Sequence, residues 1–364
     1  MSSYSVAIVR CGSQQHLADL KALEQRQLAI PHHYSTWPLH CTVGSWVWCR
    51  VSTDERFVTG FAIELTSSRA LPGTRIGQVD YLGRSLHEEI APAMGTVLSV
   101  VAHKIPRLQR LEARVFDEDP VRRRTLCDSL QAAGWSPGKR RQYSHTLIVP
   151  LADSEAEVRK TFSTRVRSTM RKALESPLLR FGPVTGTEYS ARITHLHSLP
   201  FQRTGGVPQP IDVQGILSDA SDGNSSLLIG AFAADGKAPD DLLALAWARL
   251  HGDHAVLEIN ASERSEAFSH LSPGFGLMSH LFAWAIQHGA RWVDLGGLTS
   301  TEQSADDPMR GIIEFKMRFS SDFREVAEEW QMEPNPLLAG AASAMRRIAK
   351  SVREATRGPA EKGE

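Results

Sequence analysis

The amino-acid sequence predicts an α/β (α+β) protein of two lobes, each with a mixed, mostly antiparallel sheet flanked by helices. The chain has 364 residues, which is too long for one ordinary domain and suits two. Apolar residues make up 41% and charged residues 23%, so each lobe can bury a core of its own. The order hairpin, helix, strand occurs twice without residue identity between the copies, which indicates a repeated architecture rather than a repeated sequence.

The first lobe is expected to contain a β-hairpin followed by helices and strands. Aromatic and β-branched residues are enriched on both sides of a short turn at 52–56, which is the pattern of two antiparallel strands. Farther along, Pro120 and Gly134 stand at the start and just past the end of a helix. The expected elements are strands 42–51, 57–65 and 75–82, helix 87–104, strand 111–116, helix 120–134 and strand 142–150.

The second lobe is expected to repeat this order after a connecting helix over 154–175, where apolar residues recur every four positions. A terminal helix is expected over 336–357. The elements between them are strands 226–234, 242–250 and 255–260, helix 274–288 and strand 292–295. We therefore expect domains at 1–150 and 151–330, followed by a C-terminal helical segment with a frayed end at 331–364.

Composition narrows the range of functions and compartments. Lys+Arg and Asp+Glu are 41 each, which excludes a polycation but allows local basic patches. The four cysteines form no CxxC pair, and no cluster of Cys or acidic residues accompanies two short His pairs (195/197 and 251/254), so no metal site is expected. No secretory signal and no run of 18 apolar residues occurs. These features predict a cytoplasmic protein without a membrane span, and we expect it to be a monomer.

The segment 159–172 (RKTFSTRVRSTMRK) holds six basic residues and no acid. On a helix Lys160, Arg167 and Arg171 would share a face, with Arg165 beside it. Like charges at this density repel one another unless an anion binds nearby, so phosphate is the expected ligand. The alternative is a solvated helix face paired with distant acids.

Two glycines, Gly274 and Gly276, open a predicted helix after a strand. Backbone amides at such a helix start can bind an anion, and the pyrophosphate loop of acyl-CoA acetyltransferases has this form. That loop carries Arg or Gln three residues before its first glycine, where this chain has Leu271. A plain strand-to-helix turn is the alternative.

The third notable feature is a strand that ends in Asp294-Leu-Gly296-Gly297, followed by Phe315-Lys316 on a short predicted helix. A carboxylate and flexible backbone at the C-terminal edge of a sheet lie where α/β proteins hold ligands. A substrate site is therefore expected at this edge, next to the Lys316 cation.

Three segments together, STRVRSTMRKA, FAWAIQHGARWVDLGG and EFKMRF, resemble the Fem-type aminoacyltransferases. This family belongs to the wider GNAT-like group and forms peptidoglycan cross-bridges. The resemblance covers about 145–330 and implies two GNAT-like lobes, with a C-terminal tail that packs back on the first lobe. No heptads occur between 175 and 224, so the long coiled-coil arm of some members is absent. That absence favours the shorter soluble form over one that acts on a membrane-lipid acceptor.

The resemblance also implies roles for individual residues. Phe315 and Lys316 match the functionally important Phe-Lys pair of the family. Arg165, Arg167 and Arg171 fall where the family carries basic residues near phosphate. Members move an amino acid from aminoacyl-tRNA onto an amine of a cell-wall precursor, and relatives do the same on peptide natural products.

The expected function is therefore transfer of an amino acid from aminoacyl-tRNA, as co-substrate, to an amine of a peptide or nucleotide-linked precursor, without a further cofactor. An ester is already activated, so the enzyme contributes positioning and charge stabilisation. Lys316 would stabilise the oxyanion or bind the terminal phosphate. Asp294 would accept the proton of the amine, or alternatively hold the turn after it. The basic tail at 345–357 would add to tRNA binding.

Two other function classes remain open from the sequence. One is an acyl-CoA-dependent N-acyltransferase that uses the Gly274/Gly276 helix start for pyrophosphate. The other is a degenerate pair of GNAT-like lobes that only binds an anionic ligand or a partner. The residue at Leu271 counts against acyl-CoA, and the retained Phe315-Lys316 pair counts against a scaffold without activity.

Overall fold

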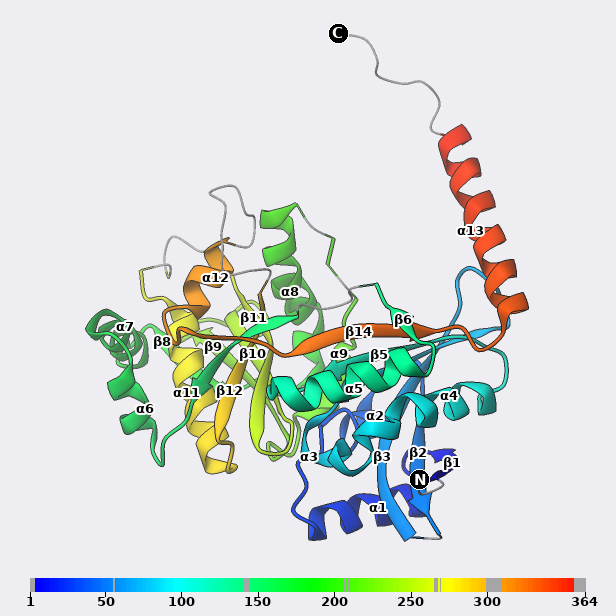
Figure 1. The fold of residues 1–364 in the computed structure, drawn as a ribbon. Coiled ribbons are helices and arrows are strands. Elements are labelled where there is room, and N and C mark those ends of the chain that lie inside the picture. The colour runs from blue at the N-terminus through cyan, green and yellow to red at the C-terminus, as the bar shows by residue number, and fades with distance from the viewer. Residues whose placement is uncertain are drawn as a thin grey trace. The chain divides into compact units, whose positions relative to one another are not determined.

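The computed structural model describes residues 4–54, 56–139, 144–205, 207–208, 210–264, 268, 270–298 and 310–356. It confirms the predicted fold class, because it contains two seven-stranded, mostly antiparallel sheets with helices against them (Figure 1). The chain divides into two compact units. Unit 1 comprises Met1–Ala22, Gly44–Arg141 and Ala327–Glu364, and unit 2 comprises Leu23–Val43 and Gln142–Val326. Neither unit is a single stretch of sequence, in contrast to the expected domains 1–150 and 151–330.

Unit 1 has a sheet in the order β1-β2-β3-β4-β5-β14-β6, in which β4 and β5 are parallel and the other neighbours antiparallel. Its strands are β1 (Tyr4–Arg10), β2 (Ser45–Thr53), β3 (Arg56–Ser67), β4 (Arg75–Leu82), β5 (Leu108–Phe116), β6 (Ser136–Pro137) and β14 (Ala327–Met332). Its helices are α1 (Gln14–Gln25, which ends in unit 2), α3 (Arg84–His87), a 3₁₀ turn at Glu88–Ala93, α4 (Met94–Lys104), α5 (Pro120–Ala132) and α13 (Pro336–Thr356).

Unit 2 has a sheet in the order β13-β7-β12-β11-β10-β9-β8, and here β11 and β12 are the parallel pair. Its strands are β7 (His145–Pro150), β8 (Leu179–Pro183), β9 (Ser226–Ala233), β10 (Leu242–Leu250), β11 (His254–Ser262), β12 (Trp292–Leu298) and β13 (Asp322–Glu325). Its helices are α2 (Trp37–His40), α6 (Glu155–Thr161), α7 (Thr164–Leu174), a 3₁₀ turn at Thr187–Tyr189, α8 (Ser190–Thr204), α9 (Val213–Asp219), α11 (Pro273–Gln287) and α12 (Arg310–Lys316).

In each sheet, the strand next to one edge is distant in the sequence from the two strands it pairs with. In unit 1 the strand between β5 and β6 is β14, which comes from near the end of the chain. In unit 2 the strand between β12 and β13 is β7, which precedes every other strand of that sheet in the sequence. The expected strand over 142–150 therefore exists, but it completes the second sheet instead of the first.

Two predicted helices are interrupted, each for an identifiable reason. The helix expected over 154–175 is α6 and α7, because Ser163 adopts an extended backbone and its side chain accepts a hydrogen bond from the Val166 amide, which starts a new helix. The helix expected over 87–104 becomes regular only at Met94. Pro92 lies in the preceding 3₁₀ turn, and proline has no amide to donate.

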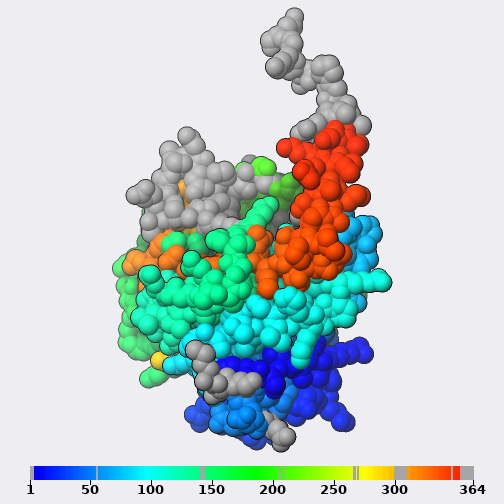
Figure 2. All heavy atoms as spheres, turned by 45° about the vertical axis from the view of Figure 1, so that its right-hand side comes forward, coloured from blue at the N-terminus to red at the C-terminus, as the bar shows by residue number. Residues whose placement is uncertain are grey.

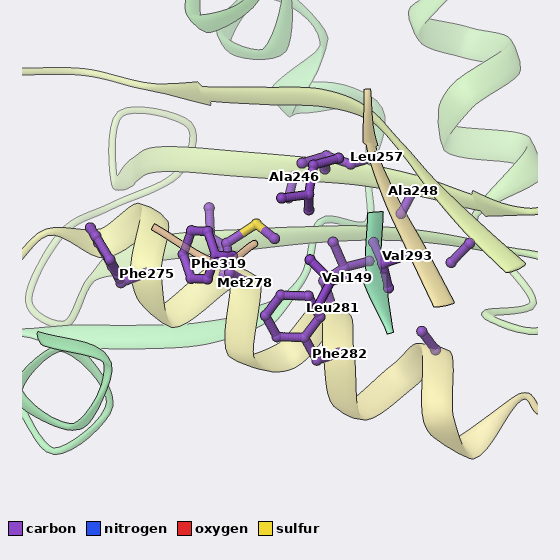
Figure 3. Close-up of a cluster of buried hydrophobic side chains, with 14 of the residues drawn as sticks. Val149, Ala246, Ala248, Leu257, Phe275, Met278, Leu281, Phe282, Val293 and Phe319 are labelled. Atoms are coloured by element: carbon purple, nitrogen blue, oxygen red, sulfur yellow. The ribbon is translucent and has the colours of Figure 1, made fainter. Parts of the chain in front are cut away.

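The core of unit 2 forms where α11 lies across the sheet (Figure 3). Met278, Leu281 and Phe282 of α11 are fully buried and face Ala246, Leu257 and Val293 of the strands. Phe162, between α6 and α7, packs against Phe282 and Phe319 with ring centroids 5.5 Å away in both cases. This packing fixes the N-terminal end of α11 and the strands β11 and β12, which together form the candidate site.

Candidate functional site

The parallel strands β11 and β12 separate along their length and leave a cavity. They are paired only from His254 to Val256 on β11 and from Trp292 to Asp294 on β12. Beyond these residues β11 stays paired with β10, with Glu258 as the extra residue of a bulge. A cavity of about 650 Å³ lies beside residues 257–262 of β11 and is closed by α8, α12 and the start of α11. This size is typical of small-molecule sites.

Lys316, the last residue of α12, lines this cavity. Its Nζ donates a hydrogen bond to the Gly297 carbonyl of β12 at 3.1 Å. Burial lowers the pKa of Lys316 to about 8, and the nearby Asp294 carboxylate acts in the opposite direction. The side chain is therefore a mostly protonated, poorly hydrated cation at pH 7, which suits it to stabilise negative charge.

The Asp294 carboxylate holds the end of β12 in place by hydrogen bonds. Its carboxylate is 3% exposed and accepts hydrogen bonds from the Thr146 hydroxyl and, at 2.6 Å, from the Gly296 amide. Gly296 has a φ of +78°, and a side chain there would come within 3.0 Å of the Leu257 carbonyl and 3.4 Å of the Lys316 Nζ. Asp294 and Gly296 thus shape the strand bulge that presents the Gly297 carbonyl to Lys316.

Phe315 separates the main cavity from a second, smaller one. Its ring packs against Phe275 and Phe319, with centroids 5.2 Å away in both cases. The second cavity, about 310 Å³, lies between α7, α12 and the start of α11, and Arg165 and Arg318 supply its cations. Both cavities share Gly311 and Phe315, so they are neighbours on either side of α12.

The basic residues of the segment 159–172 are not gathered at one anion site, in contrast to the expectation. Lys160 is paired with Glu157 at 2.6 Å. Arg167 donates hydrogen bonds to the Phe162 carbonyl at 2.8 Å and the Lys160 carbonyl at 3.2 Å, and so satisfies backbone acceptors at the end of α6. Arg165 faces the second cavity, whereas Arg171 is exposed and lines neither cavity. The structure therefore brings only Arg165 of this set to the site.

The two glycines at the start of α11 have different surroundings. Gly274 lines the main cavity, and a Cβ there would meet only the Phe315 ring at 3.7 Å. A Cβ at Gly276, in contrast, would overlap the ring of Phe181 on β8. Leu271 is buried at 4% exposure. Only Gly274 is therefore placed to contact a ligand, and Gly276 serves the packing of Phe181.

We predict that Gly276→Ala destabilises the protein by about 1–3 kcal/mol, because the added methyl group overpacks the contact with Phe181. The variant Phe181→Leu should remove most of this penalty in the double mutant, which chemical denaturation of all four proteins can measure. A penalty that persists in the Phe181→Leu background would show that Gly276 has another role.

The cavity contains functional candidates that sequence reasoning missed. Arg203, near the end of α8, and Arg264, just after β11, line it together with Lys316. Burial lowers the pKa of Arg203, and the nearby Arg264 acts in the same direction. Glu258, an acid on this stretch of β11, is bound by Arg249. The cavity is therefore cationic and suits an anionic ligand. The arginines were missed because α8 was not predicted and neither residue lies in a motif.

Comparisons with known proteins identify a matching domain family and similar folds. Residues 160–311 match the family of acetyltransferase (GNAT) domains. The crystal structure of FemX is similar, with a TM-score of 0.66 and 15% identity over 89% of this chain and 96% of FemX. So is a tandem GNAT protein from the clavulanic acid biosynthesis pathway, solved without AcCoA, with a TM-score of 0.53 and 11% identity over 92% and 99% of the two chains. No curated protein sequence matches this chain.

These matches confirm the expected resemblance to Fem-type proteins as a likeness of fold. They support an acyltransferase of the GNAT fold. No described helix is long and apolar enough to cross a membrane.

Proposed function

We propose that this chain, which has the tandem GNAT fold, transfers an amino acid from aminoacyl-tRNA to an amine of a peptide or nucleotide-linked precursor in the cytoplasm. The observation that carries the proposal is the position of Lys316, whose ammonium group lines the cavity between β11 and β12 and is held by the Gly297 carbonyl. The Phe315-Lys316 pair is also the feature for which the Fem-type resemblance implies a functional role.

The reaction needs little beyond positioning and charge stabilisation. The acceptor amine attacks the ester carbonyl, a new C–N bond forms, and the carbonyl oxygen becomes an oxyanion. The C–O bond to the tRNA ribose then breaks, and the proton lost by the nitrogen reaches the ribose oxygen. Protonated Lys316 supplies a donor for the oxyanion inside a partly dehydrated site, where such an interaction is strong.

The cationic lining of the cavity supports an acceptor that carries a carboxylate or phosphate. Arg203 and Arg264 contribute two positive charges to the lining of the cavity. Guanidinium groups bind carboxylates and phosphates in two-point fashion. Asp294 does not appear among the described residues of the cavity wall, so we assign it the alternative role of holding the Gly296 turn.

The start of α11 supports tRNA over acyl-CoA as the donor. A pyrophosphate needs several free amides at a helix start, but Leu271 and Gly276 are buried and Phe181 occupies the space against Gly276. The second cavity is lined by the cations Arg165 and Arg318 and also by the acid Glu314, and we propose that the two arginines contact a phosphate of the tRNA. An acyl-CoA-dependent N-acyltransferase remains the second candidate, because Gly274 does open onto the main cavity.

The test of this proposal is product formation by the purified protein. It is incubated with a pool of charged tRNAs and a set of amines that includes nucleotide-linked peptides, and products are identified by mass spectrometry. We expect a new amide that requires charged tRNA. A parallel reaction with uncharged tRNA and acetyl-CoA is the control, and an amide product there alone would favour the second candidate.

The rate should depend on pH through Lys316. We predict that kcat falls above about pH 8, where the Lys316 ammonium loses its proton. Arginine stays charged throughout this range. We therefore expect the pH profile of Lys316→Arg to lack this alkaline limb, the decrease in kcat above about pH 8, even if its kcat is lower than that of the parent. A limb at the same pH in both proteins would assign the titration to another group.

A further inference from the structure

Among the described side chains of the terminal helix α13, the buried ones lie near its beginning. Ala339 and Ala342 are buried, and the helix contacts β5. Farther along, Met345, Ile348 and Val352 are 46%, 58% and 56% exposed. Figure 1 shows α13 extending away from the sheet of unit 1, and in Figure 2 its red atoms form a raised ridge. Most of the described side chains of this helix are therefore exposed.

The exposed apolar residues of α13 lie in one stripe. Met345, Ile348 and Val352 follow one another at steps of three and four residues, so they share a face of the helix. Leu338 and Ala341 extend the same face toward the start of the helix. Isolated exposed apolar residues are ordinary, but a continuous stripe of this kind marks an interaction surface.

Basic residues accompany this stripe along its exposed part. Residues 336–353 contain four basic residues and no acid. By helical spacing Arg347 and Lys350 lie on the side of the helix away from Met345 and Ile348. An exposed apolar stripe with Lys and Arg on the other face is the pattern of helices that lie in the interface of an anionic membrane.

Other partners fit these two features less well. An RNA backbone would use the basic residues but would leave the apolar stripe exposed to water. A second copy of the chain would cover the stripe but would leave the cations on the opposite face of each helix without an anionic partner. An anionic bilayer accommodates both at once, because its acyl region takes the apolar side chains and its headgroups pair with the cations.

We propose that α13 lies on an anionic membrane surface, with Met345, Ile348 and Val352 in the headgroup boundary and the basic side chains at the headgroups. We expect this binding to be reversible, because an interfacial helix lies on the bilayer and does not span it. This surface belongs to unit 1 and is independent of the reaction proposed for unit 2. It would hold the chain beside the membrane whichever acyl donor it uses.

The test is cosedimentation of the full chain with lipid vesicles. We expect binding to vesicles that contain phosphatidylglycerol, little binding to pure phosphatidylcholine, and release by salt. The double variant Met345→Ser/Ile348→Ser should bind at least about tenfold less. The double variant Arg347→Gln/Lys350→Gln should bind about 25-fold less, since each cation near the surface contributes roughly fivefold. Val121→Ser, at an apolar residue of α5 that is 73% exposed, is the matched control and should bind as the parent does.

Three results would overturn the membrane assignment. One is the absence of binding to phosphatidylglycerol vesicles by the folded parent protein. Another is a concentration-dependent dimer in sedimentation velocity that Met345→Ser/Ile348→Ser abolishes, which would make the stripe a contact between copies. The third is weaker tRNA binding by Arg347→Gln/Lys350→Gln together with unchanged vesicle binding by both double variants, which would assign the basic face to RNA.

Discussion

Replacing Lys316 with methionine is expected to lower kcat by about 10²–10³ while leaving the fold intact, which is the magnitude for loss of one oxyanion donor. Methionine keeps the length and apolar volume of the side chain but removes the ammonium group that lines the cavity. Steady-state kinetics of the purified variant measures the effect. A decrease confined to kcat and kcat/KM, with unchanged KM, would identify an interaction made in the transition state.

The same substitution should also stabilise the protein or leave its stability unchanged. Because burial lowers the pKa of Lys316 to about 8 from 10.5, the folded chain binds fewer protons than the unfolded chain between these values. Stability therefore rises with pH through that window, and below it the buried cation opposes folding. Lys172→Met, on an exposed position of α7, is the matched control and should change neither turnover nor stability. Ordinary turnover in Lys316→Met would remove this residue from the site.

The second large effect concerns the donor. Activity in a crude extract should be destroyed by ribonuclease and should not return on addition of acetyl-CoA. With the purified protein, affinity for aminoacyl-tRNA should fall about 10³-fold between 50 and 200 mM salt if six phosphates are contacted. Activity that survives ribonuclease and requires acyl-CoA would instead make the protein a conventional N-acyltransferase.

A matched pair of variants separates phosphate binding from structural roles in the basic segment. Arg165→Gln should reduce the salt slope by about one charge, because Arg165 lines the second cavity. Arg167→Gln should leave the slope unchanged and lower stability instead, since its guanidinium is bound to backbone carbonyls at the end of α6. A slope reduced equally by both would mean that α7 binds RNA along its length.

The sequence predicted the fold class and the neighbourhood of Lys316 because both follow from local signals. Aromatic and β-branched enrichment marked the strands of the first hairpin, and the Asp294-Leu-Gly-Gly run marked a strand end with flexible backbone. Three features were not predicted, and two of them depend on contacts between residues that are far apart in the sequence. One is the side chain of Arg167, whose acceptors exist only because Ser163 starts a new helix. Another is Arg203, which is brought to the cavity by tertiary packing.

The third such feature is the segment 23–43, which belongs to unit 2. His32 is held there by Asp219 at 2.9 Å, with both side chains fully buried. Trp37 packs on Trp247, with ring centroids 5.4 Å away. The two residues of each pair are separated by more than half of the chain, and no periodicity in the sequence relates them.

The position of β14, which follows unit 2 in the sequence but belongs to the sheet of unit 1, has a consequence for synthesis on the ribosome. The sheet of unit 1 stays open between β5 and β6 until β14 emerges. During that interval the backbone edge of β5 has no partner, and an open edge invites pairing with other chains. The gap closes only after unit 2 has been made, so the sheet of unit 1 stays incomplete while residues 117–326 are synthesised. Chaperone protection of this edge would matter more than for a protein whose domains follow one another in sequence.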